Sequence, residues 1–183
     1  MRNDLASLRM EEVAGPTEEM VHHEEDLYER ESAREETLQF IVFRLAQEWY
    51  GVEITKVKEI IKAGRITYLP SSPEYIAGIV NLRGNILSVT DLKTIFGLPQ
   101  EEQTEKTRII AVESGTLETG LLVDEVVESI EVPVRKIEPS LLTLLADGAR
   151  YIEGQCKVGD RLIALIRVEE IFGKEGGDDG NER

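Results

Sequence analysis

Two charged residues have types and positions that suggest chemistry, Arg83 at a predicted hairpin tip and Glu59 in an earlier β-rich segment. Arg83 stands in the run Asn81-Leu82-Arg83-Gly84, and strand alternation places Asn81 and Arg83 on one face. A guanidinium held at a turn can bind a carboxylate, either Glu59 of the same chain or an acid of a partner. The alternative is a solvated arginine at a hairpin tip. The pattern suggests recognition by charge.

Residues that would support catalysis are missing from the body of the chain, residues 37–173. It contains no histidine, which removes the usual general base and most zinc sites, and it has no phosphate-binding loop motif. Asp91 precedes an apolar helical triplet and is predicted to be an N-cap. Asp124-Glu125 is expected in a solvated turn, and Cys156 is expected to be a buried apolar side chain. We therefore expect no enzymatic activity, no cofactor and no metal site.

The segment Tyr75–Gly97 must position the arginine. It predicts a strand, a tight turn at Arg83-Gly84-Asn85, a second strand and a short helix. Asp91 would cap the start of this helix, and Gly97, followed by a proline, would end it.

The same segment recurs 76 positions later, at Tyr151–Gly173, with six identities in 23 residues and matching apolar positions. Upstream the match continues with a shift of 69, so that Glu59 corresponds to Glu128. The preserved spacing favours an internal duplication with copies at about 38–97 and 107–173, the second carrying seven extra residues. Asn81 and Arg83 correspond to Lys157 and Gly159, so the repeat itself does not require them.

Short alternating segments separated by turns predict a mainly β protein made of small barrels. Leu38–Ile54 reads as a hairpin, and Thr55–Ile61 is compatible with a helical turn or a third strand. In the second copy, a hairpin is expected through Ser114-Gly115, and a short apolar helix at Leu141–Leu145.

Composition limits the partners and the compartment. The 183 residues carry a net charge of −15, and residues 1–36 contribute −8 of it. Such a chain has little attraction for nucleic acid or anionic lipid. Without an apolar leader or an apolar run of about 18 residues, and with a single cysteine, a cytoplasmic protein with no membrane insertion is expected. We expect residues 1–36 to be a disordered or frayed acidic extension and 174–183 a flexible tail.

Three runs resemble the CheW family of chemotaxis coupling proteins: YGVEITKVKEI (50–60), ITYLPSSPEYIAGIVNLRGNILSVTDL (66–92) and GLLVDEVV (120–127). The resemblance covers nearly all of 37–173. It implies two pseudo-repeated five-stranded SH3-like barrels with a shared hydrophobic core and a few short helices. It also implies that strands at the barrel edges can be exchanged between copies.

The resemblance further implies a non-enzymatic cytoplasmic adaptor, monomeric when free. Its partners would be methyl-accepting chemotaxis receptors, which recruit it to membrane arrays, and the regulatory domain of the histidine kinase CheA. Carried over by motif, Glu59 and Arg83 match a charged pair of the family, and Ile54 and Val57 match apolar positions of receptor contact. The remaining candidate contact residues lie in and before the hairpin tip: Gly78, Asn81 and Gly84.

Three other functions stay open as alternatives. A CheW-like adaptor could serve a receptor–kinase pathway other than chemotaxis. A small barrel could bind an oligomeric ligand such as an oligosaccharide or nucleic acid, which would require basic and aromatic residues on one face. It could also bind an apolar ligand in its interior, although five-stranded barrels are filled by their own side chains.

Overall fold

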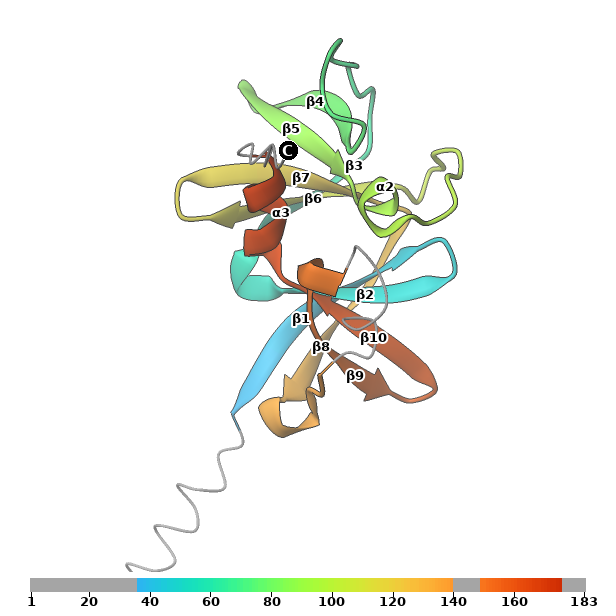
Figure 1. The fold of residues 1–183 in the computed structure, drawn as a ribbon, viewed down its shortest axis with the longest axis vertical. Helices are drawn as coiled ribbons and strands as arrows, with labels where there is room; N and C mark the ends of the chain where they lie inside the picture. Colours follow the sequence, from blue (N-terminus) through green and yellow to red (C-terminus); the bar gives the residue numbers. More distant parts are fainter. Residues whose placement is uncertain (1–35, 140–148, 176–183) are drawn as a thin grey trace, which may run out of the picture. The chain divides into compact units, whose positions relative to one another are not determined.

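The computed structural model describes residues 36–139 and 149–175, which belong to one compact unit, Glu36–Arg183. Within these ranges the chain is mainly strand, with short helical turns between strands (Figure 1). The strands are β1 Thr37–Leu45, β2 Glu48–Glu53, β3 Val57–Lys62, β4 Ile76–Leu82, β5 Asn85–Asp91, β6 Arg108–Ser114, β7 Leu117–Val123, β8 Glu125–Pro133, β9 Ile152–Val158 and β10 Arg161–Ile166. The helical elements are η1 Ile54–Lys56, α2 Leu92–Phe96, η2 Val134–Lys136, η4 Ala149–Tyr151 and α3 Val168–Glu175.

The strands form two five-stranded sheets, and each sheet takes strands from both repeats. Sheet A has the order β8-β1-β2-β10-β9, and sheet B has the order β3-β6-β7-β5-β4. The first hairpin of each copy, β1–β2 or β6–β7, therefore lies among the last three strands of the other copy and pairs with two of them, β8 and β10 or β3 and β5. The expected fold class is confirmed, and the repeat boundaries at 38–97 and 107–173 differ from the sheet boundaries.

Two glycines at equivalent positions of the repeats, Gly78 and Gly154, lie where each sheet closes on itself. In each sheet, the segment that follows one edge strand forms a bridge to the opposite edge strand. Thr67, after β3, bridges Ile79 of β4, and Glu138, after β8, bridges Gln155 of β9. A Cβ atom on Gly78 would lie 2.3 Å from the Thr67 carbonyl oxygen, and one on Gly154 would lie 3.0 Å from the Glu138 carbonyl oxygen. A side chain at either position would disturb this closure.

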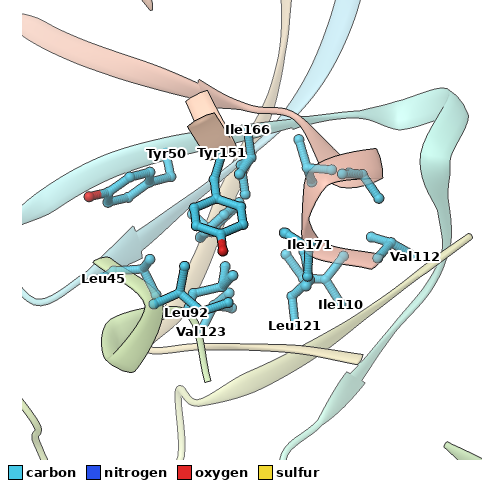
Figure 2. Packing of buried hydrophobic residues seen from close by; sticks show 14 of the residues in the cluster. Leu45, Tyr50, Leu92, Ile110, Val112, Leu121, Val123, Tyr151, Ile166 and Ile171 are labelled. Atoms are coloured by element: carbon cyan, nitrogen blue, oxygen red, sulfur yellow. The ribbon is translucent and has the colours of Figure 1, made fainter. Parts of the chain in front are cut away.

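A shared apolar core lies between the two sheets. Its members come from both sheets and from both short helices, and Figure 2 shows how their side chains meet: Leu45 and Tyr50 of sheet A, Ile110 and Leu121 of sheet B, Leu92 of α2 and Ile171 of α3. Each sheet also has its own smaller cluster, around Phe40 and Ile163 in sheet A and around Val89 and Ile109 in sheet B. Because burial of apolar surface is the main driving force of folding, this shared core makes the two sheets one cooperative unit.

The segment that contains Arg83 folds as its sequence predicts. Strands β4 and β5 pair antiparallel around a two-residue turn, and α2 follows directly. The Asp91 carboxylate accepts hydrogen bonds from the Lys93 and Thr94 backbone amides, and Gly97 ends the helix at φ 66°. Both the predicted N-cap and the predicted stop are confirmed.

The structure also decides the ambiguous stretch Thr55–Ile61, because a single 3-10 turn, η1, leads into the strand β3. Cys156 is 2% exposed and packs among apolar side chains, as predicted. The expectations for residues 1–35, for the helix at Leu141–Leu145 and for the tail beyond Glu175 concern residues outside the described ranges. Among the described helices, none has the length and apolar character needed to cross a bilayer.

Candidate functional site

The β4–β5 hairpin places Arg83 in an unusual backbone conformation. Leu82 pairs with Asn85, so Arg83 and Gly84 form the loop, with φ values of 53° and 92°. Two positive φ values in succession define the type I′ turn, which matches the twist of a hairpin but strains a residue that has a side chain. The Asn81 side-chain oxygen accepts a hydrogen bond from the Gly84 amide at 2.8 Å and supports the turn.

Arg83 reaches across the surface of sheet B to Glu59. Its Nη2 donates to Glu59 Oε2 at 2.9 Å, so the internal pairing expected from the sequence is present. The Arg83 side chain is 81% exposed, whereas that of Glu59 is 23% exposed. Glu59 therefore anchors the arginine while most of the guanidinium remains open to an external carboxylate.

A shallow cavity of about 250 Å³ adjoins this pair. Its walls include Ile86, a residue that is 66% exposed, and the ion pair of Lys58 with Glu118 at 2.8 Å. Glu118 raises the pKa of Lys58, which keeps this amine charged. The site thus combines an exposed aliphatic side chain with charges of both signs, a composition suited to a protein surface.

The other candidate residues fall into two places. Ile54 lies in η1 and Val57 begins β3; both are partly buried and pack against the shared core, where the chain passes from sheet A to sheet B. Val57 and Glu59 lie two residues apart on β3, so the apolar and charged candidates adjoin along that strand. Gly78 lies at the closure of sheet B, away from the hairpin tip. Its backbone at φ 144° and the close approach of Thr67 require a glycine there, so the fold alone accounts for this residue.

Sequence comparison of the repeats missed a second glutamate–arginine pair on sheet A. Glu128, the counterpart of Glu59, binds Arg161 at 2.5 Å. By the repeat shift, Arg161 corresponds to Asn85, two residues beyond the position of Arg83. Its guanidinium also lies 5.0 Å from the centre of the Trp49 ring, and both residues line a cavity of about 410 Å³. The signal that could have revealed this pair is an arginine at each hairpin end, within the turn in the first copy and directly after it in the second.

The prediction of a solvated turn at Asp124-Glu125 is wrong for Asp124. Asp124 Oδ1 accepts a hydrogen bond from Lys93 Nζ at 2.7 Å, and Oδ2 accepts one from the Ala46 amide at 2.6 Å. The Lys93 side chain is 5% exposed and that of Asp124 is 16% exposed. The turn lies where the chain passes from sheet B to sheet A, so a neighbouring helix and hairpin cover it. The residues next to Asp124 in the sequence do not indicate that a distant helix and hairpin pack over it.

Nothing in the described ranges forms a cluster of three metal-ligating side chains. The Cys156 thiol has a pKa raised by burial, which is the opposite of the shift that activates a nucleophilic cysteine. The geometry of the described surface supports protein recognition.

Comparison with known proteins identifies the family to which this chain belongs. A family model described as a CheW-like domain matches residues 39–176. The chemotaxis protein CheW of Helicobacter pylori is 35% identical over 159 residues, covering 82% of this chain and 96% of that protein. CheW of Bacillus subtilis is 35% identical over 135 residues, covering 74% and 86%. A crystal structure of the scaffolding protein TtCheW from Thermoanaerobacter tengcongensis superimposes with a TM-score of 0.71 at 37% identity, covering 82% of this chain and 94% of that one. This chain belongs to the CheW family.

Proposed function

We propose that this protein is a chemotaxis adaptor without enzymatic activity that couples methyl-accepting receptors to the regulatory domain of the histidine kinase CheA. It acts in the cytoplasm and reaches receptor arrays through these partners. Membership of the CheW family and similarity to a protein described as a scaffold support the proposal. The observation that carries it at the level of residues is the exposed guanidinium of Arg83, held by Glu59 at a strained turn.

The strain argues that Arg83 is retained for its side chain. A residue other than glycine in the left-handed region costs roughly 1–3 kcal/mol. Its repeat counterpart, Gly159, occupies the same region at φ 60° and meets no such cost. The exposed ion pair with Glu59 returns at most about 1 kcal/mol. Contact with a partner's carboxylate would account for an arginine here.

The receptor surface is assigned to the apolar strip that begins at Ile54 and Val57. These side chains are partly buried at the junction of the sheets, and Glu59 follows on the same strand. A helical segment of a receptor can place apolar residues against such a strip and an acidic residue near Arg83. Individual contacts are expected to be modest, because an array gains strength from many weak contacts.

The test is a pull-down with two separate baits, the CheA regulatory domain and a receptor cytoplasmic fragment. Wild-type protein should bind both, and Arg83→Glu should reduce binding about tenfold or more while the protein stays folded. Arg161→Glu is the matched control, since it changes an arginine of the second glutamate–arginine pair. Failure of the wild-type protein to bind either bait would remove the adaptor function, and undiminished binding by folded Arg83→Glu would remove the role of Arg83.

The alternative function, binding of an apolar ligand inside a barrel, receives no support, because side chains fill the space that each sheet encloses. Phe40, Val42 and Ile163 fill the interior of sheet A, and Val89 and Ile109 contribute to that of sheet B. All five side chains are completely buried. The cavities described above lie at the surface and are partly lined by charged residues. A titration with a hydrophobic fluorescent probe should therefore give no saturable binding to the folded protein.

A further inference from the structure

The chain passes between the sheets at two repeat-related crossovers, and each crossover is tied to a short helix by an ion pair. From sheet A to sheet B it passes through η1, where Lys56 binds Glu169 of α3 at 2.5 Å. From sheet B back to sheet A it passes through Asp124, which binds Lys93 of α2 at 2.7 Å. Lys93 and Glu169 correspond under the shift of 76, whereas Asp124 corresponds under the shift of 69 to Thr55, the neighbour of Lys56. The two ties are therefore similar, with opposite polarity and a crossover partner displaced by one residue.

The two ties differ in their surroundings. The Lys93 and Asp124 side chains are 5% and 16% exposed, whereas those of Lys56 and Glu169 are 35% and 47% exposed. Removing one partner of a buried ion pair leaves an uncompensated charge, whereas an exposed pair is screened by water and salt. The Lys93–Asp124 tie should therefore resist opening far more than the Lys56–Glu169 tie.

Asp124 also holds the first hairpin of sheet A directly. Its carboxylate accepts from the Ala46 amide at 2.6 Å, and its own amide donates to the Arg44 carbonyl at 3.1 Å. Ala46 has φ 50°, a conformation that the bond to Asp124 helps to maintain. One carboxylate thus joins the β1–β2 turn of sheet A to the helix α2, which follows β5 of sheet B.

The exposed tie lies on the other crossover, beside Ile54 and Val57. Helix α3 follows β10 of sheet A and contacts β6 of sheet B (Figure 1). Lys56 joins the start of that helix to η1, and Ile54 within η1 and Val57 directly after it pack against the shared core. Since Val168, Ile171 and Phe172 fix α3 in the shared core, a change in this tie would act on η1 and alter the junction where Ile54 and Val57 lie.

We propose that the Lys93–Asp124 pair is the fixed hinge between the two sheets and that the Lys56–Glu169 pair is a releasable latch on the opposite crossover. The asymmetry is a property of the free chain and does not depend on the adaptor function. If the adaptor function holds, opening of the latch regulates the Ile54–Val57 strip. It would then give the protein two inter-sheet arrangements that a partner can select between.

The experiment uses full-length protein with spin labels at Ile86→Cys in sheet B and Leu162→Cys in sheet A, in a Cys156→Ala background. Both labelled positions are exposed, at 66% and 55%. Double electron–electron resonance measures the inter-sheet distance distribution, and amide hydrogen exchange at Ala46 reports the hinge. The latch variants Lys56→Gln and Glu169→Gln should shift or broaden the distribution and change Ala46 exchange by less than about twofold. The hinge variants Asp124→Asn and Lys93→Met should accelerate Ala46 exchange about tenfold or more.

Three outcomes would overturn the proposal: an unchanged distribution in both latch variants, loss of Ala46 protection in them, or unchanged Ala46 exchange in a folded hinge variant. Should the hinge variants fail to fold, wild-type protein at about 1 M salt carries the test. Screening at that ionic strength acts over about 3 Å and weakens exposed pairs first. The distribution should then move towards that of Glu169→Gln while Ala46 stays protected, and any other result counts against the hinge and latch. Binding of partners does not enter these measurements, so their failure leaves the adaptor function standing.

Discussion

Arg83 occupies the same left-handed turn position as its repeat counterpart, Gly159, with φ values of 53° and 60°. One sequence unit has therefore folded into two equivalent hairpins, and one of them carries a side chain where the other has none. The two hairpins thus share a backbone conformation and differ in whether a side chain is present at this position. The hairpin requires a positive φ, and the guanidinium is an addition that the fold does not need.

Arg83→Gly should accordingly leave the fold intact while removing the proposed contact. Glycine relieves the strain of the left-handed residue, and the loss of an exposed ion pair costs little, so unfolding free energy should change by no more than about 1 kcal/mol. Urea denaturation checks this, with Arg83→Ala as the companion variant that loses the guanidinium but keeps the strain. A fall of several kcal/mol for Arg83→Gly would show that the arginine has a structural role.

Gly78→Ala should be strongly destabilising, by about 3 kcal/mol or more. The added Cβ would lie 2.3 Å from the Thr67 carbonyl oxygen, and φ is 144°, so steric overlap adds to backbone strain. Gly84→Ala is the matched control, because it has a positive φ of 92° but open space around the Cβ position. It should lose only about 1–2 kcal/mol in the same thermal or urea denaturation. Equal losses for the two variants would contradict the role of Gly78 in closing sheet B.

The Cys156 thiol should react with a disulfide reagent only when the protein unfolds. It is 2% exposed and burial raises its pKa, so thiolate is scarce and inaccessible in the folded state. The rate should be lower than in urea by a factor on the order of 10³ or more, because reaction requires opening of strand β9. Leu162→Cys in a Cys156→Ala background provides the exposed reference and should react at the rate of a free thiol. Comparable rates for the two thiols would contradict the packing of Cys156.

Glu153→Gln should stabilise the protein at neutral pH. Glu153 is an exposed residue of β9, but neighbouring protein atoms partly desolvate its carboxyl and raise its pKa above 4.5, and the negative charge of Glu53 adds to the shift. The folded state therefore binds this proton more tightly than the unfolded chain, and ionisation destabilises the fold as pH rises above about 4.5. The increase in the free energy of unfolding caused by the substitution should be present at pH 7 and should vanish as the pH falls below 4.5, the ordinary pKa of a glutamate.

Thermal denaturation of both proteins across that pH range measures the difference. Glu101→Gln, at an exposed position of the connector between repeats, makes the same change in net charge and should give a much smaller effect. A stabilisation by Glu153→Gln that is the same at all pH values would show that the charge is not its source.

Local features of the fold were predictable because their causes lie within a few residues. The hairpin at Arg83-Gly84, the Asp91 cap and the Gly97 stop each depend on neighbours one to five positions away. The duplication could also be predicted, since identical and apolar residues recur at the same spacing in the two copies. The Arg83–Glu59 pair joins residues 24 apart and could be proposed only as one option among partners.

The environment of Asp124 was not predictable. Lys93 and Ala46, which bind its carboxylate, are 31 and 78 residues away, and no periodicity relates the three positions. The Glu128–Arg161 pair was missed for a related reason. Strict repeat correspondence points to Gly159, whereas Arg161, two residues further along at the start of β10, binds the corresponding carboxylate of Glu128.

The duplicated unit, the alternation that makes it β and the presence of arginine in place of glycine at one turn can all be read from the amino-acid sequence. These follow from side-chain period and backbone preference, which act locally. The exchange of the first hairpins between the two sheets arises in the tertiary structure, as does the difference between a buried ion pair at one crossover and an exposed one at the other. Alternation specifies which face of a strand is buried but not which strand lies beside it; that choice is made by the shared core, through contacts between residues far apart in the chain.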